Sequence, residues 1–399
     1  MINNFERSWV ILNYLRWNSD QEHPVSRAAM MKDSAMLPYV EGKGTFNDAI
    51  FHMALAMNCG DNEMVLPPEQ WKISYQAFLE KYGGEKETED GSDEIPKGSG
   101  EKESRLPIRG LHYRHTFSYE EINALIEGIL FSRTLDSQTA NRIVEKIEDH
   151  LTTKFYKKGP KNICTVREAV PADRERLREN LLLIQRAIDD RVKIAFRFNG
   201  YDRRRELVPV RAEKDIVSPY YLVANGGRYY LLACKDGESE QKMSIWRVDL
   251  MTELEIPGRT ERCRGKRALE KREVNNLPRE WSEDFLFQHL NMAYDKPIPI
   301  TLRIHNPWMG RDGQLWTNYT FLYDWFGDTF RYERTEADGD IVRVMCSPFA
   351  MVNWALQYAD RVEVLGPPDV REKVVEKIRI LNCKYGIDRN LNAKTENQI

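Results

Sequence analysis

Residues 226–256 read GGRYYLLACKDGESEQKMSIWRVDLMTELEI, and this stretch decides the fold of the middle of the chain. Two apolar runs flank a polar turn, as they do in a β-hairpin. In the first run, alternation places Tyr230 and Leu232 on one face of a strand and Leu231 on the other. The second run contains WRVD at 246–249. The stretch therefore predicts a hairpin that closes a core and is also the scaffold of a charged pocket.

The segments before this hairpin have the same period of two. Residues 193–198 (KIAFRF) alternate between charged and apolar side chains, and Asn199-Gly200 is a strong turn signal. Further strand-like runs lie at 206–210, 220–224, 229–234 and 244–250. About five short strands separated by Gly-rich turns predict a small β-barrel.

The first 117 residues predict a helix-turn-helix unit. Helices are expected at 5–15 and 27–36, and a third is expected to begin at Thr45 as its N-cap. Residues 110–117 alternate like an exposed strand and are expected to complete a wing. Between these elements, residues 84–104 are almost all charged or Gly, Ser and Pro, which predicts a disordered insertion.

Helices and then a mixed region are expected on either side of the barrel. Ser118 and Glu121 have the spacing of a capping box and start a long helix. Further helices are expected at 137–155 and 172–190. After residue 297 the order is strand, strand, strand, helix, strand, helix, which predicts a compact α+β domain.

Composition limits the classes of function. The 399 residues are 41% hydrophobic and 11% aromatic, enough for real cores in two or three domains. The formal net charge is -3, from 59 basic and 62 acidic residues, which neither supports nor excludes a nucleic-acid partner. No apolar run approaches the length of a membrane span and the first residues lack a signal-peptide core, so a cytoplasmic location is expected.

Enzyme and metal-site motifs are missing from the sequence. It contains no P-loop, no dinucleotide-binding GxGxxG after a strand, no HExxH and no GxSxG. The six cysteines are scattered without a CxxC pair, which favours reduced thiols over a zinc site or a disulfide framework. His112 and His115 lie on a strand-like segment, where a spacing of three points them to opposite faces. We therefore expect no catalytic residues, no metal and no cofactor.

Basic residues concentrate near the predicted barrel. Between 191 and 211 there are seven, against the two acids Asp202 and Glu206. Arginine forks bind phosphate and tyrosine faces stack on bases, so a nucleic-acid or nucleotide ligand is one interpretation. The other is a solvated strand face whose charge discourages edge pairing. The candidate ligand-binding residues are Arg197, Arg203, Arg204, Arg205, Tyr220, Arg228, Tyr230 and Arg247.

The third N-terminal helix is the second candidate site. Its polar face would be available to DNA, and neighbouring basic side chains could reach phosphates. The alternative is a small helical domain that serves oligomerisation. The candidate DNA-binding residues are Arg27, Lys32, Lys43, Thr45, Asn47, Asp48 and His52.

The middle strands resemble those of the WYL domain, which is named after a Trp-Tyr-Leu run. That run corresponds to YYL at 229–231, with Tyr in the place of Trp, and WRVD at 246–249 follows in a later strand. PYYLV at 219–223 is similar to the strand before the motif. The segments 354–358 and 362–367 are similar to the extension that commonly follows this domain. The N-terminal unit is similar to the winged helix-turn-helix of such regulators.

The resemblance implies a bacterial transcriptional regulator, usually a homodimer, whose DNA-binding domain is controlled by a Sm-like barrel that senses a ligand. Single-stranded or oligonucleotide nucleic acid is the implied ligand class, and DNA damage or phage defence the implied setting. The sequence departs from the family at Ser244 and Leu250, where arginine is frequent, and at Asp48, where a basic residue is common.

We therefore expect a multidomain α+β protein. Its expected parts are a winged helix-turn-helix domain with its insertion at 1–117, a helical linker at 118–190, a small Sm-like WYL barrel at 191–257, a connecting segment at 258–296, a ferredoxin-like C-terminal extension domain at 297–385 and a flexible tail at 386–399.

Two functions stay open. The first is a homodimeric regulator that binds a double-stranded DNA operator and responds to a nucleic-acid or nucleotide ligand. The second is a nucleic-acid-binding accessory protein that modulates a partner enzyme without reading an operator.

Overall fold

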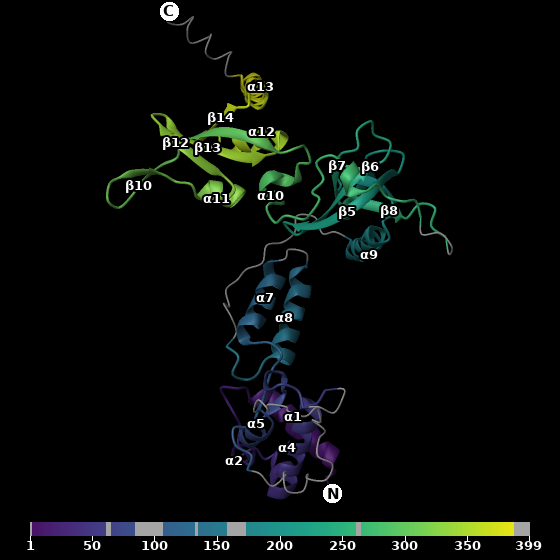
Figure 1. Ribbon diagram of the computed structural model, residues 1–399, viewed down its shortest axis with the longest axis vertical. Coiled ribbons are helices and arrows are strands. Elements are labelled where there is room, and N and C mark those ends of the chain that lie inside the picture. The colour runs from purple at the N-terminus through teal and green to yellow at the C-terminus, as the bar shows by residue number, and fades with distance from the viewer. Residues whose placement is uncertain are drawn as a thin grey trace, which may run out of the picture. The chain divides into compact units, whose positions relative to one another are not determined.

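The computed structural model describes residues 2–60, 65–83, 107–131, 135–157, 173–260 and 265–386. The chain divides into two units, Met1–Ala169 and Val170–Ile399, whose elements are labelled in Figure 1. The expected insertion at 84–104 and residues 387–399 of the expected tail lie outside the described residues.

Helices and a two-stranded ladder build the N-terminal part. The helices are α1 (Asn4–Asn18), α2 (Arg27–Met30), α3 (Leu37–Val40), α4 (Lys43–Asn58) and α5 (Gln76–Tyr82), and the antiparallel ladder pairs β1 (Ile73–Ser74) with β2 (His112–Tyr113). Phe46, Ile50 and Met53 recur at helical spacing, so one face of α4 enters the core that also holds Ile11 and Leu15 of α1. The opposite face of α4 is left to solvent.

The helix expected at 27–36 is interrupted after α2. The Asp33 carboxylate accepts a hydrogen bond from the backbone N–H of Ala35 (2.9 Å). Such a local bond competes with the helical ladder, and the chain turns before α3 begins. Of the helix predicted at 27–36 only the first turn, α2, is formed, and α3 begins after its predicted end.

Thr45 is not the N-cap of α4, which begins two residues earlier and has Gly42 at its N-cap position. The Thr45 hydroxyl instead donates to the carbonyl oxygen of Gly42 (3.0 Å) within the first turn. The strand expected at 110–117 is also shorter than predicted, because β2 contains only two residues.

The expected capping box is present at the start of α7 (Tyr119–Phe131). The N–H of Ser118 donates to the Glu121 carboxylate (2.8 Å), and the N–H of Glu121 donates to the Ser118 hydroxyl (3.2 Å). Helix α7 packs against α8 (Ser137–Leu151). Helix α9 (Arg174–Asp190), which the sequence grouped with this linker, belongs to the second unit, where its Ile184 and Ala187 are fully buried.

A curled sheet occupies the middle of the chain (Figure 1). Its strands are β3 (Ile194–Tyr201), β4 (Leu207–Pro209), β5 (Asp215–Asn225), β6 (Arg228–Lys235), β7 (Met243–Arg247) and β8 (Met251–Glu255). They are ordered β4-β3-β5-β6-β7, and β8 pairs back onto β3, which bends the sheet into a half-barrel. A 3₁₀ turn, Val248–Leu250, joins β7 to β8.

The turn predicted at Asn199-Gly200 is wrong, because β3 runs through both residues. The Asn199 side chain is buried, and its amide donates to the carbonyl of Leu250 (2.9 Å) and the hydroxyl of Thr252 (2.9 Å). These partners lie more than fifty residues away in the sequence. Asn199 therefore anchors a strand, and the chain reverses direction after Tyr201.

Strand β6 is covered on both faces, as its alternation predicts. Leu231 and Ala233 enter one core with Phe196 and Trp246, under α9. Leu232 enters a second core on the other face. The segment at 258–296, expected as a connector, supplies much of that second core through Leu269, Val274, Leu277, Phe285 and Met292.

An antiparallel sheet and three helices form the C-terminal part. Its elements are β9 (Ile298–Ile304), α11 (Thr320–Phe326), β12 (Arg331–Glu336), β13 (Gly339–Cys346), α12 (Pro348–Gln357), β14 (Val362–Gly366) and α13 (Pro368–Tyr385), with strand order β12-β13-β9-β14. The β-α-β-β-α-β element order is that of a split βαβ unit. Trp354 of α12 is buried in the core of this C-terminal domain.

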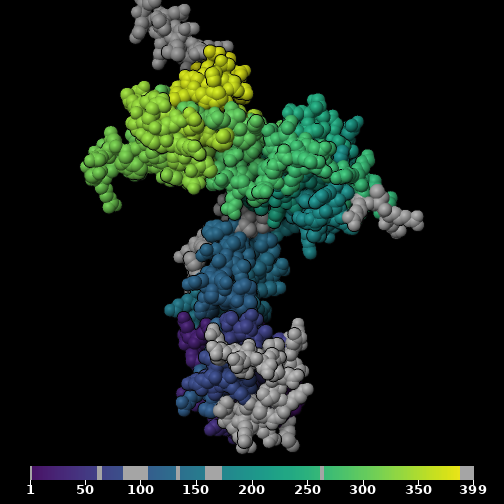
Figure 2. All heavy atoms as spheres, viewed as in Figure 1, coloured from purple at the N-terminus to yellow at the C-terminus, as the bar shows by residue number. Residues whose placement is uncertain are grey.

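One helix and two strands of this domain were not predicted. Helix α11 buries Leu322 and Phe326 in the core. The strands β10 (Pro307–Met309) and β11 (Leu315–Thr317) form a hairpin that extends from the domain as an arm, as the space-filling view shows (Figure 2).

No helix among the described residues combines the length and apolar character needed to cross a bilayer. Within the same residues, no three His, Cys, Asp or Glu side chains are grouped closely enough to hold a metal ion. Cys234, Cys346 and Cys383 are thiols, and Cys164 and Cys263 lie outside the described residues.

Candidate nucleic-acid interface

A buried carboxylate joins two of the predicted arginines. The 3₁₀ turn between β7 and β8 places Asp249 inside the sheet, 6% exposed. Asp249 accepts hydrogen bonds from Arg228 at the start of β6 (Nη1–Oδ2, 3.3 Å) and from Arg247 at the end of β7 (Nη2–Oδ2, 2.6 Å; Nε–Oδ1, 3.2 Å). Two guanidinium groups on one carboxylate leave one net positive charge. Both arginine side chains stay partly exposed, at 33% and 29%.

Arg247 is held charged beside an aromatic ring. Burial favours the neutral form of its guanidinium, but the hydrogen bonds to Asp249 outweigh this effect and raise the pKa of Arg247. In the β6–β7 register Tyr230 lies directly opposite Arg247, so both side chains are on one face of the sheet. Tyr201 also lies close enough to affect the electrostatics of Arg247. The guanidinium of Arg247 and the phenol groups of Tyr230 and Tyr201 therefore lie close together at the β7 edge of the sheet.

The arginine run 203–205 lies in a tight turn between β3 and β4. The Asp202 carboxylate accepts hydrogen bonds from the backbone N–H groups of Arg204 (2.8 Å) and Glu206 (2.9 Å), which fixes the turn. Arg205 completes it with a left-handed backbone (φ 67°). The three arginine side chains are exposed, and their guanidinium groups form no hydrogen bond or ion pair with any described residue. The turn thus presents three available cations.

Two of the predicted ligand-binding residues have structural partners instead. Arg197 donates to the Glu253 carboxylate (3.1 Å) and to the carbonyl of Ala212 (2.6 Å), and its hydrogen bond lowers the pKa of Glu253. Tyr220 is 7% exposed, and its hydroxyl donates to the carbonyl of Leu269 (3.1 Å) under the segment that covers the second core. Tyr220 is therefore a core residue.

Sequence reasoning missed the part played by two acidic residues. Asp249 orients Arg228 and Arg247, and Asp202 shapes the arginine turn, although neither acid is among the predicted site residues. The position of Asp249 two residues after Arg247, at the end of an apolar strand, is the signal that would have indicated a buried ion pair.

We expect Tyr220→Phe to lower the free energy of unfolding by about 1 kcal/mol, because the Leu269 carbonyl loses its donor. The affinity for a labelled single-stranded oligonucleotide should not change. Tyr230→Ala, by contrast, should weaken that affinity about tenfold, since a stacking face is lost. Urea unfolding and fluorescence anisotropy measure the two effects. An equal loss of affinity in both variants would contradict the assignment.

The predicted DNA-contacting residues divide into exposed and buried sets. Arg27 donates to the carbonyl oxygens of Val40 and Glu41, so it ties α2 to α3. Asn47 is 5% exposed and points into the core, which corrects its prediction as a DNA contact. The remaining predicted residues are exposed: Lys32, Lys43, Thr45, Asp48 and His52. Of these, the last three share one face of α4, because their spacings are three and four.

Residues 179–256 match the WYL domain, and residues 296–381 match the WCX domain. The curled sheet with α9 and the C-terminal sheet domain are thus the regions with family counterparts. No curated protein matches the sequence.

Two solved structures are similar to the chain, with low sequence identity and low TM-scores. The proteasome accessory factor B/C (PafBC) of Arthrobacter aurescens is 16% identical with a TM-score of 0.24, over 68% of this chain. A CRISPR Cas-related protein is 14% identical with a TM-score of 0.31, over 69% of this chain and 88% of its own. The chain spans 37% of the length of PafBC.

Proposed function

We propose that this chain, in which a WYL domain is followed by a WCX domain, is a homodimeric, DNA-binding transcriptional regulator whose WYL domain senses nucleic acid. The observation that carries the proposal is the arginine surface, defined as Arg203, Arg204, Arg205, Arg228 and Arg247. Two members are oriented by the buried Asp249, and three are exposed without a partner among the described residues.

The chemistry of this surface suits a single strand. Guanidinium forks bind phosphate oxygens in two parallel hydrogen bonds, and each such contact releases condensed counterions from the nucleic acid. Tyr230 lies beside Arg247 and offers a ring face to an unpaired base. A duplex keeps its bases stacked inside and cannot use that face, so we expect single-stranded ligand to be preferred.

The N-terminal part would read the operator. Helix α4 would enter the major groove with Thr45, Asp48 and His52 towards the bases, while Lys32 and Lys43 contact phosphates. Ligand can act only by favouring one dimer geometry over another, because it changes affinity through differential binding to two states. The helices between 118 and 190 are the proposed transmitters.

One observation favours the alternative, a nucleic-acid-binding accessory protein that modulates a partner enzyme. With Asn47 buried and Arg27 engaged by backbone carbonyls, the exposed face of α4 carries the acidic Asp48 among few donors. A carboxylate facing phosphates weakens duplex binding. Such a protein would bind single strands without a defined operator.

Selection of duplex DNA from a random pool separates the two functions. The regulator should enrich one palindromic site, and His52→Ala with Lys43→Ala should lower affinity for it at least tenfold, since a base contact and a phosphate contact are lost. Single-strand binding by this double variant should stay unchanged. Enrichment of no site, together with retained single-strand binding, would support the accessory protein and contradict the regulator.

A further inference from the structure

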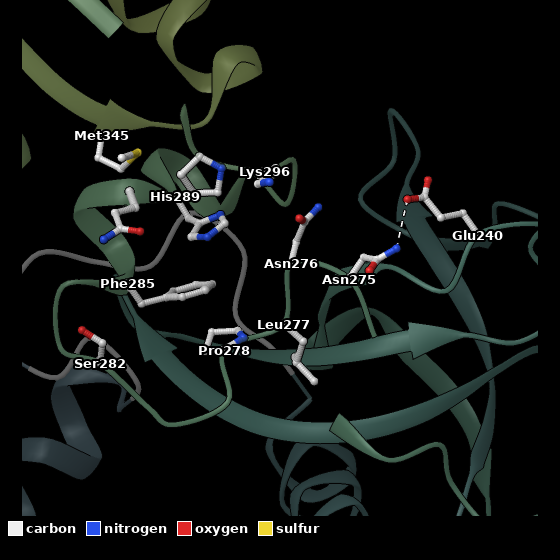
Figure 3. Close-up of a pocket in the computed structure, with 12 residues that line it drawn as sticks. Glu240, Asn275, Asn276, Leu277, Pro278, Ser282, Phe285, His289, Lys296 and Met345 are labelled. Atoms are coloured by element: carbon white, nitrogen blue, oxygen red, sulfur yellow. Dashed lines mark hydrogen bonds between the residues drawn. The ribbon is translucent and has the colours of Figure 1, made fainter. Parts of the chain in front are cut away.

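A cavity with its own set of lining residues lies within the second unit (Figure 3). It has a volume of about 920 Å³, and most of its lining comes from the segment that follows the curled sheet. Glu240 of the loop between β6 and β7, Lys296 and Pro297 just before β9, and Met345 of β13 complete it. Ligand pockets for drug-sized molecules are commonly ~300–1,000 Å³. None of the five residues of the arginine surface lines it.

The inner wall of this cavity is aromatic and apolar. Phe285 (4% exposed) stacks on the imidazole of His289 (3% exposed), with ring centroids 4.2 Å apart and planes inclined by 20°. Leu277 is also buried there, next to Pro278. Figure 3 shows the Phe285 and His289 rings one above the other at the side of the cavity. Phe285 also packs against Trp281 (ring centroids 5.3 Å apart), so its ring is enclosed between Trp281 and His289, and the apolar surface left to a ligand is the edge of Phe285 together with Pro278.

His289 offers one hydrogen-bond acceptor. Burial lowers the pKa of His289, so its imidazole is neutral at pH 7. Its Nδ1 lies 2.6 Å from the carbonyl oxygen of Ala293, which can only accept, so Nδ1 carries the hydrogen. Nε2 is then an acceptor, and no described residue donates to it. A ligand N–H or O–H would satisfy it.

Amide groups and one cation surround this wall. The Asn276 and Gln288 side-chain amides form no hydrogen bond with any described residue, and Asn275 donates to the Glu240 carboxylate (3.2 Å). Lys296 is exposed and has no ion-pair partner in the described part of the chain. In Figure 3 Asn276 and Lys296 lie near His289, whereas the Asn275 amide points towards Glu240. Donors, acceptors and a positive charge therefore converge on one volume.

We propose that this cavity binds a nucleoside monophosphate. A base would lie against Pro278, Met345 and the edge of Phe285 and would present its own edge to Asn276 and Gln288, because amide side chains match the paired donor and acceptor of a base edge. An exocyclic N–H of the base would donate to Nε2 of His289. The phosphate would lie at Lys296, the one lysine that lines the cavity.

Such a ligand would bridge two parts of the second unit. Phe285 and His289 come from the segment between the two matched domains, whereas Lys296 and Met345 lie in the region that matches the WCX domain. A bound nucleotide would thus stabilise one arrangement of this segment against the C-terminal sheet. The inference is independent of the proposed regulator function, because the two sites share no residue.

Isothermal titration of the full chain with AMP and GMP tests this inference, with adenosine, guanosine and inorganic phosphate as reference ligands. We expect saturable binding of at least one monophosphate, about tenfold weaker binding of the matching nucleoside and none of phosphate alone. Lys296→Gln should remove the difference between nucleotide and nucleoside. Asn276→Gly should weaken both about tenfold and keep the left-handed backbone of this residue (φ 64°).

The chain supplies matched controls for both variants. Lys377→Gln removes an exposed lysine of α13, and Asn291→Gly changes another exposed asparagine with a left-handed backbone (φ 53°). Asn276 is half-buried, so Asn291 matches it in backbone conformation and not in exposure. Both control variants should bind the nucleotide as the unchanged protein does. Arg204→Ala with Arg247→Ala should also retain mononucleotide binding. Absence of saturable binding, or binding that survives Lys296→Gln and Asn276→Gly but fails in the arginine variant, would overturn the inference.

Discussion

Replacing Arg204 and Arg247 together by alanine is expected to lower the affinity of the full chain for a single-stranded oligonucleotide by about 10- to 100-fold. Arg204 is exposed in the arginine turn, and Arg247 is oriented by Asp249 beside Tyr230. Each lost phosphate contact should also reduce the slope of log K against log salt by ~0.7 for a single strand. Two contacts therefore predict a slope smaller by ~1.4, measured by anisotropy titrations at several salt concentrations.

A second double variant separates site-specific binding from net charge. Arg186→Ala with Arg379→Ala removes two positive charges from exposed positions of α9 and α13. This control should change affinity less than twofold and leave the slope unchanged at physiological salt, where charges beyond about 8 Å are largely screened. If both double variants lose affinity equally, the arginine surface is not the binding site.

Trp354→Ala is expected to lower the free energy of unfolding of the C-terminal domain by about 3–5 kcal/mol. Trp354 is 1% exposed and packs against Phe321, Phe326 and Tyr358, with ring centroids 6.0, 5.0 and 5.1 Å away. Removal of the indole leaves a cavity between Phe321, Phe326 and Tyr358, and these rings cannot move together to fill it. Because a domain is stable by only ~5–15 kcal/mol, amide exchange in β9 and β13 should accelerate at least 100-fold.

A conservative variant and a surface variant test the physical reason. The indole N–H of Trp354 is buried without a hydrogen-bond partner among the described residues. Trp354→Phe keeps a ring and removes that group, so its cost should be below about 1.5 kcal/mol. Trp316→Ala, in the half-exposed hairpin, should leave exchange in β9 and β13 unchanged. Equal acceleration by Trp354→Ala and Trp316→Ala would refute the packing argument.

Sequence patterns predicted correctly those elements that depend only on residues close together in the sequence. The capping box at Ser118 needs only residues three apart, and it is present. The alternation of β6 needs only a period of two, and its two faces lie in two different cores. Helix α11 escaped prediction because its seven residues are too few to show a helical period clearly.

Errors arose where distant residues outweigh a local preference. Asn199-Gly200 has the composition of a turn, but Leu250 and Thr252 hold the Asn199 amide within a strand. Tyr220 is an aromatic residue of the kind that stacks on ligands, but its hydroxyl donates a hydrogen bond to the carbonyl oxygen of Leu269, 49 positions away. These partners are too distant in the sequence to be seen in the short segments from which a periodicity or a turn is predicted.

The sequence by itself determined that arginines and tyrosines gather in the middle strands, because their order along the chain and the period of two require no other information. Only the tertiary structure decided which of them are available. Arg197 is neutralised by Glu253, 56 positions away, whereas Arg228 is oriented by Asp249, 21 positions away. Whether an arginine can bind a ligand depends on which acidic side chains lie close to it in space, and the curl of the sheet sets those distances.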